Sequence, residues 1–165
     1  MTDKERIEEL LRSSGRRNIE RVITYLNESD FYTAHPARHH LQPGGLAQHC
    51  LEVYETMRSN ACWMMLDSII ITALLHDIAT ASHPATSDYH GHGRRSVAIL
   101  EEVCDFPLQD EERSAILYHL HPDAKEIKYN PLALCLCFAD GLSAAKHPRF
   151  YDEKRLYEGL DGYTY

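Results

Sequence analysis

The sequence lacks an apolar segment long enough to cross a membrane. Its most apolar stretch, residues 64–79, is interrupted by Asp67 and by the pair His76-Asp77, whereas a membrane-spanning helix needs about 20 predominantly apolar residues. The N-terminus is charged from residue 3 and has no apolar core of a targeting signal. We therefore expect a cytoplasmic protein without a membrane partner.

Cysteine and positive charge are also scarce. The five cysteines are odd in number, spread over residues 50–137, and form no Cys-x-x-Cys pair. We therefore expect free buried thiols rather than a disulfide framework or a zinc finger. The 17 lysines and arginines are outnumbered by 25 aspartates and glutamates, which gives a net charge of −8. That balance argues against a broad nucleic-acid-binding surface.

Strand-like alternation of apolar and polar residues is absent beyond chance, and no repeat or linker divides the 165 residues. Apolar residues recur at helical spacing instead. The prediction is an all-α fold, a single helical bundle over residues 1–165 with its functional site in the bundle core. The expected helices run from a capping box at Thr2 to Gly15, from a cap at Asn18 through Leu26, and over residues 45–59, 66–80, 92–104, 109–120 and 131–145.

Eleven histidines are the most unusual feature of the composition. Four of them directly precede proline, which disfavours helical backbone, so we place these four at helix ends or in loops. They are His35, His83, His121 and His147. The other seven need a different explanation.

Several ionisable residues lie within helices that are otherwise apolar. His76 and Asp77 end the most apolar helix, and His49, His119 and Asp140 occur on three others. Burying such groups is costly unless they are paired or bound to something. Imidazole and carboxylate are both good metal ligands, and a helical bundle can direct them to one point. For the pair His76-Asp77 taken alone, a capped helix C-terminus is an equally good explanation.

Five ordered segments resemble the HD superfamily of metal-dependent phosphohydrolases, whose pattern is H…HD…D. These segments, which lie within residues 31–145, are GGLAQHCLEVY, ALLHDIA, GHGRRSVAIL, AILYHL and FADGLSA. The resemblance implies a metal site with His49, His76, Asp77 and Asp140 as core ligands. It adds His92 and His119 as ligands of a second ion. His90 is the alternative to His92 if the alignment shifts by two residues.

Under this resemblance, Asp77 bridges the two ions and is also the catalytic carboxylate. A ligand set of nitrogen and oxygen atoms without thiolate favours Mn²⁺, Fe²⁺, Co²⁺, Ni²⁺ or Zn²⁺. The expected reaction is hydrolysis of a phosphate ester or phosphoanhydride by a metal-activated water. The expected substrate is a nucleotide or a similar small phosphorylated molecule.

One position departs from the family pattern. Many members have lysine three residues after the HD aspartate, where this chain has Thr80. Other basic residues that could contact substrate phosphate in its place are Arg38, His40, Arg94, Arg95 and His121. The departure keeps two alternatives open: a catalytically impaired regulator that binds nucleotide or metal, and a di-iron HD-type oxygenase.

Overall fold

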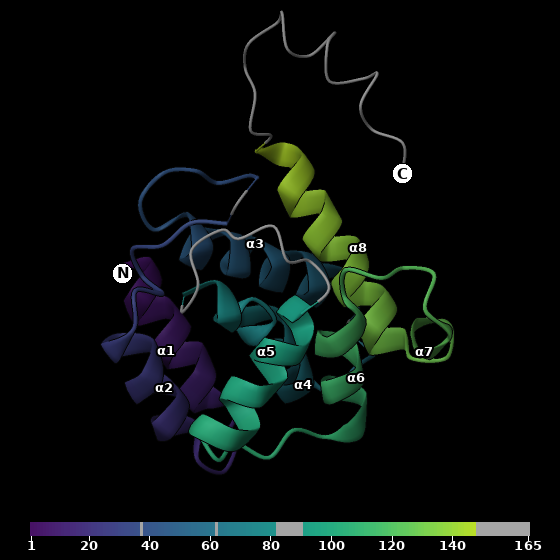
Figure 1. Ribbon diagram of the computed structural model, residues 1–165, viewed down its shortest axis with the longest axis horizontal. Coiled ribbons are helices and arrows are strands. Elements are labelled where there is room, and N and C mark those ends of the chain that lie inside the picture. The colour runs from purple at the N-terminus through teal and green to yellow at the C-terminus, as the bar shows by residue number, and fades with distance from the viewer. Residues whose placement is uncertain (37, 62, 82–90, 148–165) are drawn as a thin grey trace, which may run out of the picture.

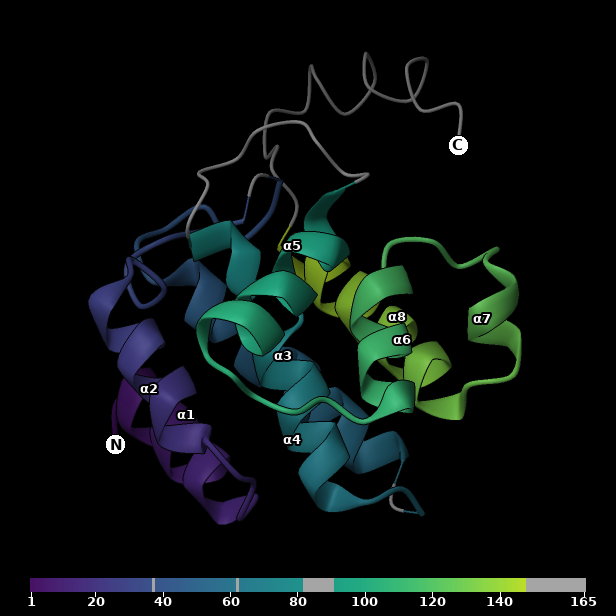
Figure 2. The same ribbon diagram turned by 60° about the horizontal axis from the view of Figure 1, so that its bottom comes forward.

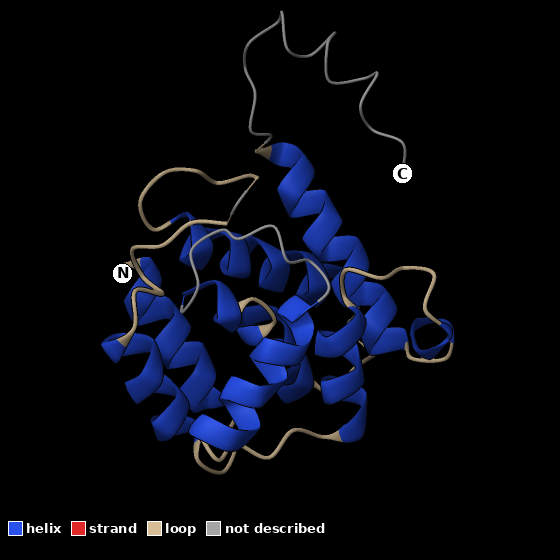
Figure 3. Ribbon diagram, in the orientation of Figure 1, coloured by secondary structure: helices blue, strands red, loops and turns tan. Residues whose placement is uncertain are grey.

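The computed structural model describes residues 1–36, 38–61, 63–81 and 91–147. Within these ranges the regular elements are helices and there is no strand (Figure 3), so the predicted all-α fold is confirmed. The elements are α1 (Asp3–Ser13), α2 (Ile19–Glu28), α3 (Gly45–Asn60), α4 (Leu66–Leu75), the 3₁₀ turn η1 (Ile78–Ala81), α5 (His92–Ala98), the π-helical turn η3 (Ile99–Val103), α6 (Asp110–Tyr118), α7 (Lys125–Lys128) and α8 (Pro131–Lys146).

The first and last helices begin where the sequence predicts. Thr2 and Glu5 form the reciprocal capping box of α1. The Asn130 side chain caps α8 by accepting a hydrogen bond from the Ala133 amide, with Pro131 in the first turn. Asn18, in contrast, does not cap α2 with its side chain, so that prediction is wrong. Its backbone is left-handed, with φ 63°, and its amide donates to the carbonyl oxygen of Asp105 at 2.5 Å.

Two predicted helices change character before their expected ends. The fourth was expected to reach Thr80, but α4 ends at Leu75 and the chain tightens into η1. Nδ1 of His76 donates a hydrogen bond to the carbonyl oxygen of Ala73 at 2.9 Å, and this bond caps the last turn of α4. The fifth helix widens into a π-helical turn after Ala98. The sequence prediction also missed the short helix α7.

Helix α4 lies in the centre of the bundle, as its apolar composition predicts. Its residues from Ser68 to Leu75 are buried. Helices α1, α3, α6 and α8 pack against it, and α5 packs on α6 (Figures 1 and 2). The ends of α4 and α6 and the start of α5 lie close together, and Asp140 of α8 lies beside them. Among the described residues, no helix combines the length and apolarity needed to span a membrane.

A buried ion pair joins the α1–α2 turn to the helices of the core. The Arg16 guanidinium contacts the carboxylate of Glu112 on α6 (Nη1–Oε1 2.5 Å) and, at 3.4 Å, Asp67 on α4. Ser68 donates its hydroxyl hydrogen to the same Glu112 carboxylate at 2.8 Å. Because Glu112 is fully buried, these bonds supply the partners that its charge requires. They set α6 against α4.

Candidate metal centre

The structure brings together six of the residues that the sequence singles out. They come from five elements or their ends: His49 from α3, His76 and Asp77 from the end of α4, His92 from the start of α5, His119 from the end of α6, and Asp140 from α8. His49, His76 and His119 are essentially inaccessible to solvent. Residues 91 positions apart in the chain therefore meet in one cluster.

Asp77 is the centre of this cluster. Its Oδ1 atom lies 2.5 Å from Nε2 of His92 and 3.3 Å from Nε2 of His119. Its Oδ2 atom lies 3.6 Å from Nε2 of His76 and 3.7 Å from Nε2 of His49. Each oxygen of one carboxylate thus faces a different pair of imidazoles.

The two pairs of imidazoles divide the cluster into two halves, and Asp140 belongs to the half that contains His49 and His76. Its Oδ1 atom lies 3.0 Å from Nε2 of His49 and 3.7 Å from Nε2 of His76. One half therefore contains two histidines and two carboxylates, and the other contains His92, His119 and the remaining oxygen of Asp77. Ligand atoms close enough together to hold a metal ion occur in both halves and also across them, in the group of His76, His119 and Asp140.

In His76 and His119, the ring nitrogen that does not face the cluster forms a hydrogen bond with the backbone. Nδ1 of His76 donates to the carbonyl oxygen of Ala73 at 2.9 Å, and Nδ1 of His119 donates to that of Ile116 at 2.7 Å. Each imidazole bonds a carbonyl three residues earlier, at the end of its own helix. A neutral imidazole whose Nδ1 carries the proton has its lone pair on Nε2, which is the atom that faces the cluster.

The Nε2 atoms of His49, His76 and His119 are buried and have no well-formed hydrogen bond in the structure. Carboxylate oxygens lie near them, but not in hydrogen-bonding geometry. Buried polar atoms without a partner are rare, and each needs an explanation. Three lone pairs directed at the same space as two carboxylates fit a metal ion better than any group of the chain itself.

The cluster also shifts the protonation of its members. Burial alone would lower the pKa of His76, but the charges of Asp77 and Asp140 outweigh it and raise that pKa to about 9. Without a metal ion His76 is therefore protonated at neutral pH, and a cation that binds its Nε2 atom would displace this proton. Burial would likewise raise the pKa of both carboxyls, yet the neighbouring imidazoles lower each pKa well below its ordinary value. Both aspartates therefore remain anionic at neutral pH, as metal ligands must.

Close backbone packing positions two of the histidines. A Cβ atom at Gly93 would lie 2.5 Å from the carbonyl oxygen of Ile116 on α6, so only glycine allows the first turn of α5 to approach α6 so closely. This contact lies next to His92 on one helix and near His119 on the other. The rings of these two histidines consequently lie 5.6 Å apart.

The candidate substrate-binding residues differ in exposure. Arg94 on α5 and Arg38 on the loop before α3 are exposed, whereas Arg95 and His121 are partly exposed. The fifth, His40, is buried and contacts Glu52 (Nε2–Oε2 3.2 Å). These side chains lie on α5 or next in the chain to α3 and α6, and all three helices contribute clustered residues.

Thr80, at the position where many family members have lysine, is buried in η1. The described pre-proline histidines, His35, His121 and His147, lie outside the helices as predicted, while His83 and His90 fall outside the described residues. Among the cysteines that the structure describes, Cys50, Cys104, Cys135 and Cys137 are free thiols, as predicted. Cys50 and Cys104 are buried as expected, whereas Cys135 and Cys137 are only partly buried, and Cys62 falls outside the described residues.

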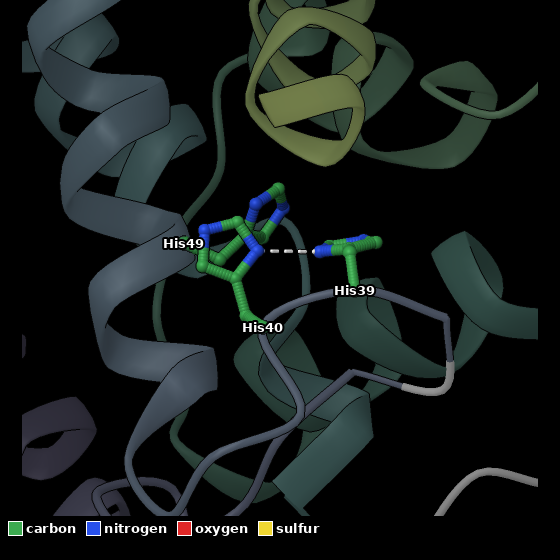
Figure 4. Close-up of side chains that lie close together, drawn as sticks. All are labelled: His39, His40 and His49. Atoms are coloured by element: carbon green, nitrogen blue, oxygen red, sulfur yellow. Dashed lines mark hydrogen bonds between the residues drawn. The ribbon is translucent and has the colours of Figure 1, made fainter. Parts of the chain in front are cut away.

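Two neighbours of the cluster, Glu52 and Ser143, were missed by the sequence interpretation. Glu52 and Ser143 lie three residues beyond His49 and Asp140, one helical turn along α3 and α8, and contact each other at 2.8 Å. His39 places its ring 4.6 Å from that of His49 (Figure 4). The i, i+3 spacing is the one signal that could have drawn attention to Glu52 and Ser143.

Comparison with known proteins gives one match. A family model described as "HD domain" matches residues 46–145. That range contains all six residues of the cluster. No curated protein and no solved structure matches the chain.

Proposed function

Because this chain belongs to the HD domain family, we propose that it is a metal-dependent phosphohydrolase. Its substrate would be a phosphate ester or phosphoanhydride of a nucleotide or a similar small molecule. The observation that carries the proposal is the convergence of three unpartnered imidazole Nε2 atoms on two ionised aspartates in the bundle core.

In this proposal the cluster holds two divalent transition-metal ions. His49, His76 and Asp140 would hold one ion, His92 and His119 would hold the other, and Asp77 would take part in both sites. When bound, the ions would supply Lewis acidity that neutralises charge on phosphate oxygens and makes a coordinated water more acidic. Mn²⁺, Fe²⁺, Co²⁺, Ni²⁺ and Zn²⁺ all suit this set of nitrogen and oxygen ligands.

The chain's own residues have three tasks in the reaction. The carbonyl oxygens of Ala73 and Ile116 keep the imidazoles of His76 and His119 in one tautomer and one orientation. Asp77 remains anionic and lies between the two halves of the site. The surrounding apolar helices lower the local dielectric, which strengthens the attraction between the site and an anionic phosphate.

Basic residues on the loop before α3, on α5 and after α6 would bind the phosphate and orient it. Thr80 cannot neutralise a phosphate charge as a lysine would, so this task would fall to Arg38, Arg94, Arg95 and His121. His40 is buried, and its Nε2 atom contacts Glu52. A guanidinium can donate two parallel hydrogen bonds to one phosphate.

The test combines metal analysis with activity. The purified protein should contain up to two equivalents of transition metal and hydrolyse at least one member of a nucleotide and phosphoester panel with added Mn²⁺, Co²⁺ or Ni²⁺. Asp77→Asn should lose metal and reduce kcat/KM by at least about 10³-fold, because it removes a shared charge that organises the transition state. The exposed-residue variant Asp123→Asn is the matched control and should behave as wild type. Absence of both bound metal and turnover in the wild type would reject the proposal.

The burial of threonine at residue 80 favours one second candidate, a regulator that binds nucleotide or metal without turnover. The same panel distinguishes the two. A regulator would keep its metal and would be stabilised thermally by a nucleotide, yet would release no product. A Thr80→Lys variant that gains activity would support this candidate. Oxygen consumption by the iron-loaded protein would instead indicate an HD-type oxygenase.

A further inference from the structure

Glu52 on α3 has more polar partners than any role in helix stability requires. Its Oε2 atom lies 2.8 Å from Oγ of Ser143 and 3.2 Å from Nε2 of His40. Its Oε1 atom lies 3.0 Å from Nε2 of His147 and 3.1 Å from Nε2 of Gln48. One partly buried carboxylate thus joins α3 to the end of α8 and to the loop before α3.

The bond to Ser143 leads directly to the metal centre. An ionised carboxylate can only accept, so Ser143 donates its hydroxyl hydrogen to Glu52. The Ser143 oxygen can then accept from Nδ1 of His49, which lies 3.1 Å away. With its proton on Nδ1, His49 has its lone pair on Nε2, which faces Asp140 and Asp77. Glu52 therefore acts on His49 through Ser143, as the backbone carbonyl oxygens act on His76 and His119.

The bond between Glu52 and His40 fixes the tautomer of His40 and links it to His39. If Nε2 of His40 donates to Glu52, Nδ1 of His40 must accept, and Nδ1 of His39 donates to it at 2.8 Å (Figure 4). His40 has a left-handed backbone, with φ 48°, which is uncommon for a residue other than glycine. Gly45 makes room for this loop, because a Cβ atom there would lie 1.8 Å from the His40 carbonyl oxygen.

The environment of Glu52 keeps it ionised. Burial alone would raise its pKa, but the hydrogen bonds from Ser143 and Gln48 outweigh burial and lower it. The carboxylate therefore accepts from all four partners at neutral pH.

We propose that Glu52 is a positioning residue of the metal centre, which orients His49 through the Ser143 hydroxyl and holds His40 and His39 beside it. The inference rests on the proposed function, since it assumes that His49 binds a metal ion. Carboxylate–histidine–metal arrangements of this kind normally have no intervening group, whereas here a serine hydroxyl lies between the carboxylate and the imidazole.

The experiment measures metal affinity by competition with a chromogenic chelator, using Mn²⁺ and Co²⁺ and the full-length protein. Glu52→Ala and Ser143→Ala should each weaken one metal site, the one that contains His49, by about 10–100-fold with unchanged stoichiometry. Glu52→Gln, which keeps an acceptor oxygen, should lose less. The matched control is Glu55→Gln, one helical turn further along α3, where the glutamate is more exposed and contacts Arg6. Its affinity should equal that of wild type.

The double variant Glu52→Ala/Ser143→Ala separates a positioning role from a purely structural one. If Glu52 acts through Ser143, the double variant should bind metal no more weakly than the worse single variant, because either change breaks the same chain of bonds. Independent effects whose fold-losses multiply would overturn the proposal, as would affinities equal to that of the Glu55 control.

Metal stoichiometry provides a further check. If the His40, Glu52 and His147 group itself bound a metal ion, the wild type would bind one additional equivalent that Glu52→Ala and His147→Ala both lose, and the positioning role would be rejected. A wild type that binds no metal at all would contradict the proposed function. A wild type that binds metal, together with variants that match it, would contradict this inference alone.

Discussion

At the scale of the residue, hydrogen bonds behind the histidine rings determine what the rings can bind. His76 and His119 each donate Nδ1–H to a carbonyl oxygen three residues earlier, and His49 donates to a serine hydroxyl. In all three the tautomer with a free Nε2 results. The residue type alone does not show which of the two ring nitrogens can bind a metal ion. These contacts turn a histidine-rich composition into a specific set of candidate ligand atoms.

The buried thiol of Cys104 permits a test of pH dependence. Burial raises its pKa to about 11, so its reactive thiolate should be about 100-fold scarcer at pH 8 than for a cysteine of ordinary pKa, near 9. We expect alkylation of the native protein at Cys104 to be slow and to accelerate about tenfold per pH unit up to about pH 11. Peptide mapping after iodoacetamide treatment measures the rate.

The sign of the linked stability change follows from the same shift. Because the unfolded thiol ionises at lower pH than the folded one, the contribution of Cys104 to stability is constant below about pH 9 and falls between about pH 9 and 11. Alkylation at pH 8 as fast as in urea-unfolded protein would contradict the burial of this thiol.

The buried carboxylate of Glu112 should be important for stability. Glu112→Gln leaves the Arg16 guanidinium, whose side chain is only 12% exposed, without its closest carboxylate. Breaking a buried pair in this way costs about 3–5 kcal/mol, and we expect a loss near the lower limit because Asp67 still contacts Arg16. Urea unfolding measures the free energy. The control Glu101→Gln, in a more exposed pair with Arg113, should cost less than about 1 kcal/mol.

At the scale of the element, the position of each helix end matters more for the site than the helix itself. The end of α4, the start of α5 and the end of α6 each contribute one or two of the clustered residues. The helix termini converge because α5 contacts α6 at the glycine of residue 93 and because the Glu112 ion pair sets α6 against α4. The helices themselves have no unusual feature, and the contacts between them bring the clustered residues together.

Two glycine variants test the close approach of α5 to α6. Gly93→Ala would place a Cβ atom 2.5 Å from a backbone carbonyl, so we expect a loss of about 1–3 kcal/mol from overpacking. Metal binding should also weaken, because His92 and His119 move apart. Gly141→Ala on α8 meets nothing within 4 Å and should stabilise the helix by about 0.5–1 kcal/mol. Equal effects of the two variants on unfolding would contradict the packing described.

At the scale of the whole molecule, one core connects the N-terminal helices to the family-matched region. Buried residues of α1 and α2 belong to the same apolar cluster as those of α3, α4, α6 and α8. We therefore propose that α1 and α2 are part of the same domain as residues 46–145, although the family match does not reach them.

Removal of metal should lower the stability of the whole domain. Ligands that bind the folded state alone stabilise it by about 2.7 kcal/mol at a free concentration of 100 times Kd. We therefore expect chelation to lower Tm by several degrees and re-addition of Mn²⁺ or Co²⁺ to restore it. Calorimetry with and without a chelator measures the shift. The Asp77→Asn variant should show no such response, and a metal-dependent Tm in that variant would place the ions elsewhere.

The sequence by itself determined the helical class, the approximate extent of most helices and the identity of the six clustered residues. The helices and five of the six residues follow from local spacing, from capping groups such as Thr2 and Asn130, and from ionisable residues in apolar contexts. The sixth residue, His92, was identified only by the resemblance to the HD superfamily. The sequence prediction was wrong about the Asn18 cap and the end of α4. The Asn18 amide bonds the carbonyl oxygen of Asp105 and does not cap α2, and the chain tightens into η1 after α4 ends at Leu75.

Only the tertiary structure decided how the six residues face one another and what supports them. It showed that each oxygen of Asp77 serves a different pair of imidazoles and that Glu52 reaches His49 through Ser143. Such relations join residues from separate helices, and the periodicity of one helix carries no information about the angle and distance at which it packs on another. The geometry of the centre therefore depends on how the helices pack together, whereas the residue types that give it its chemistry can be identified in the sequence.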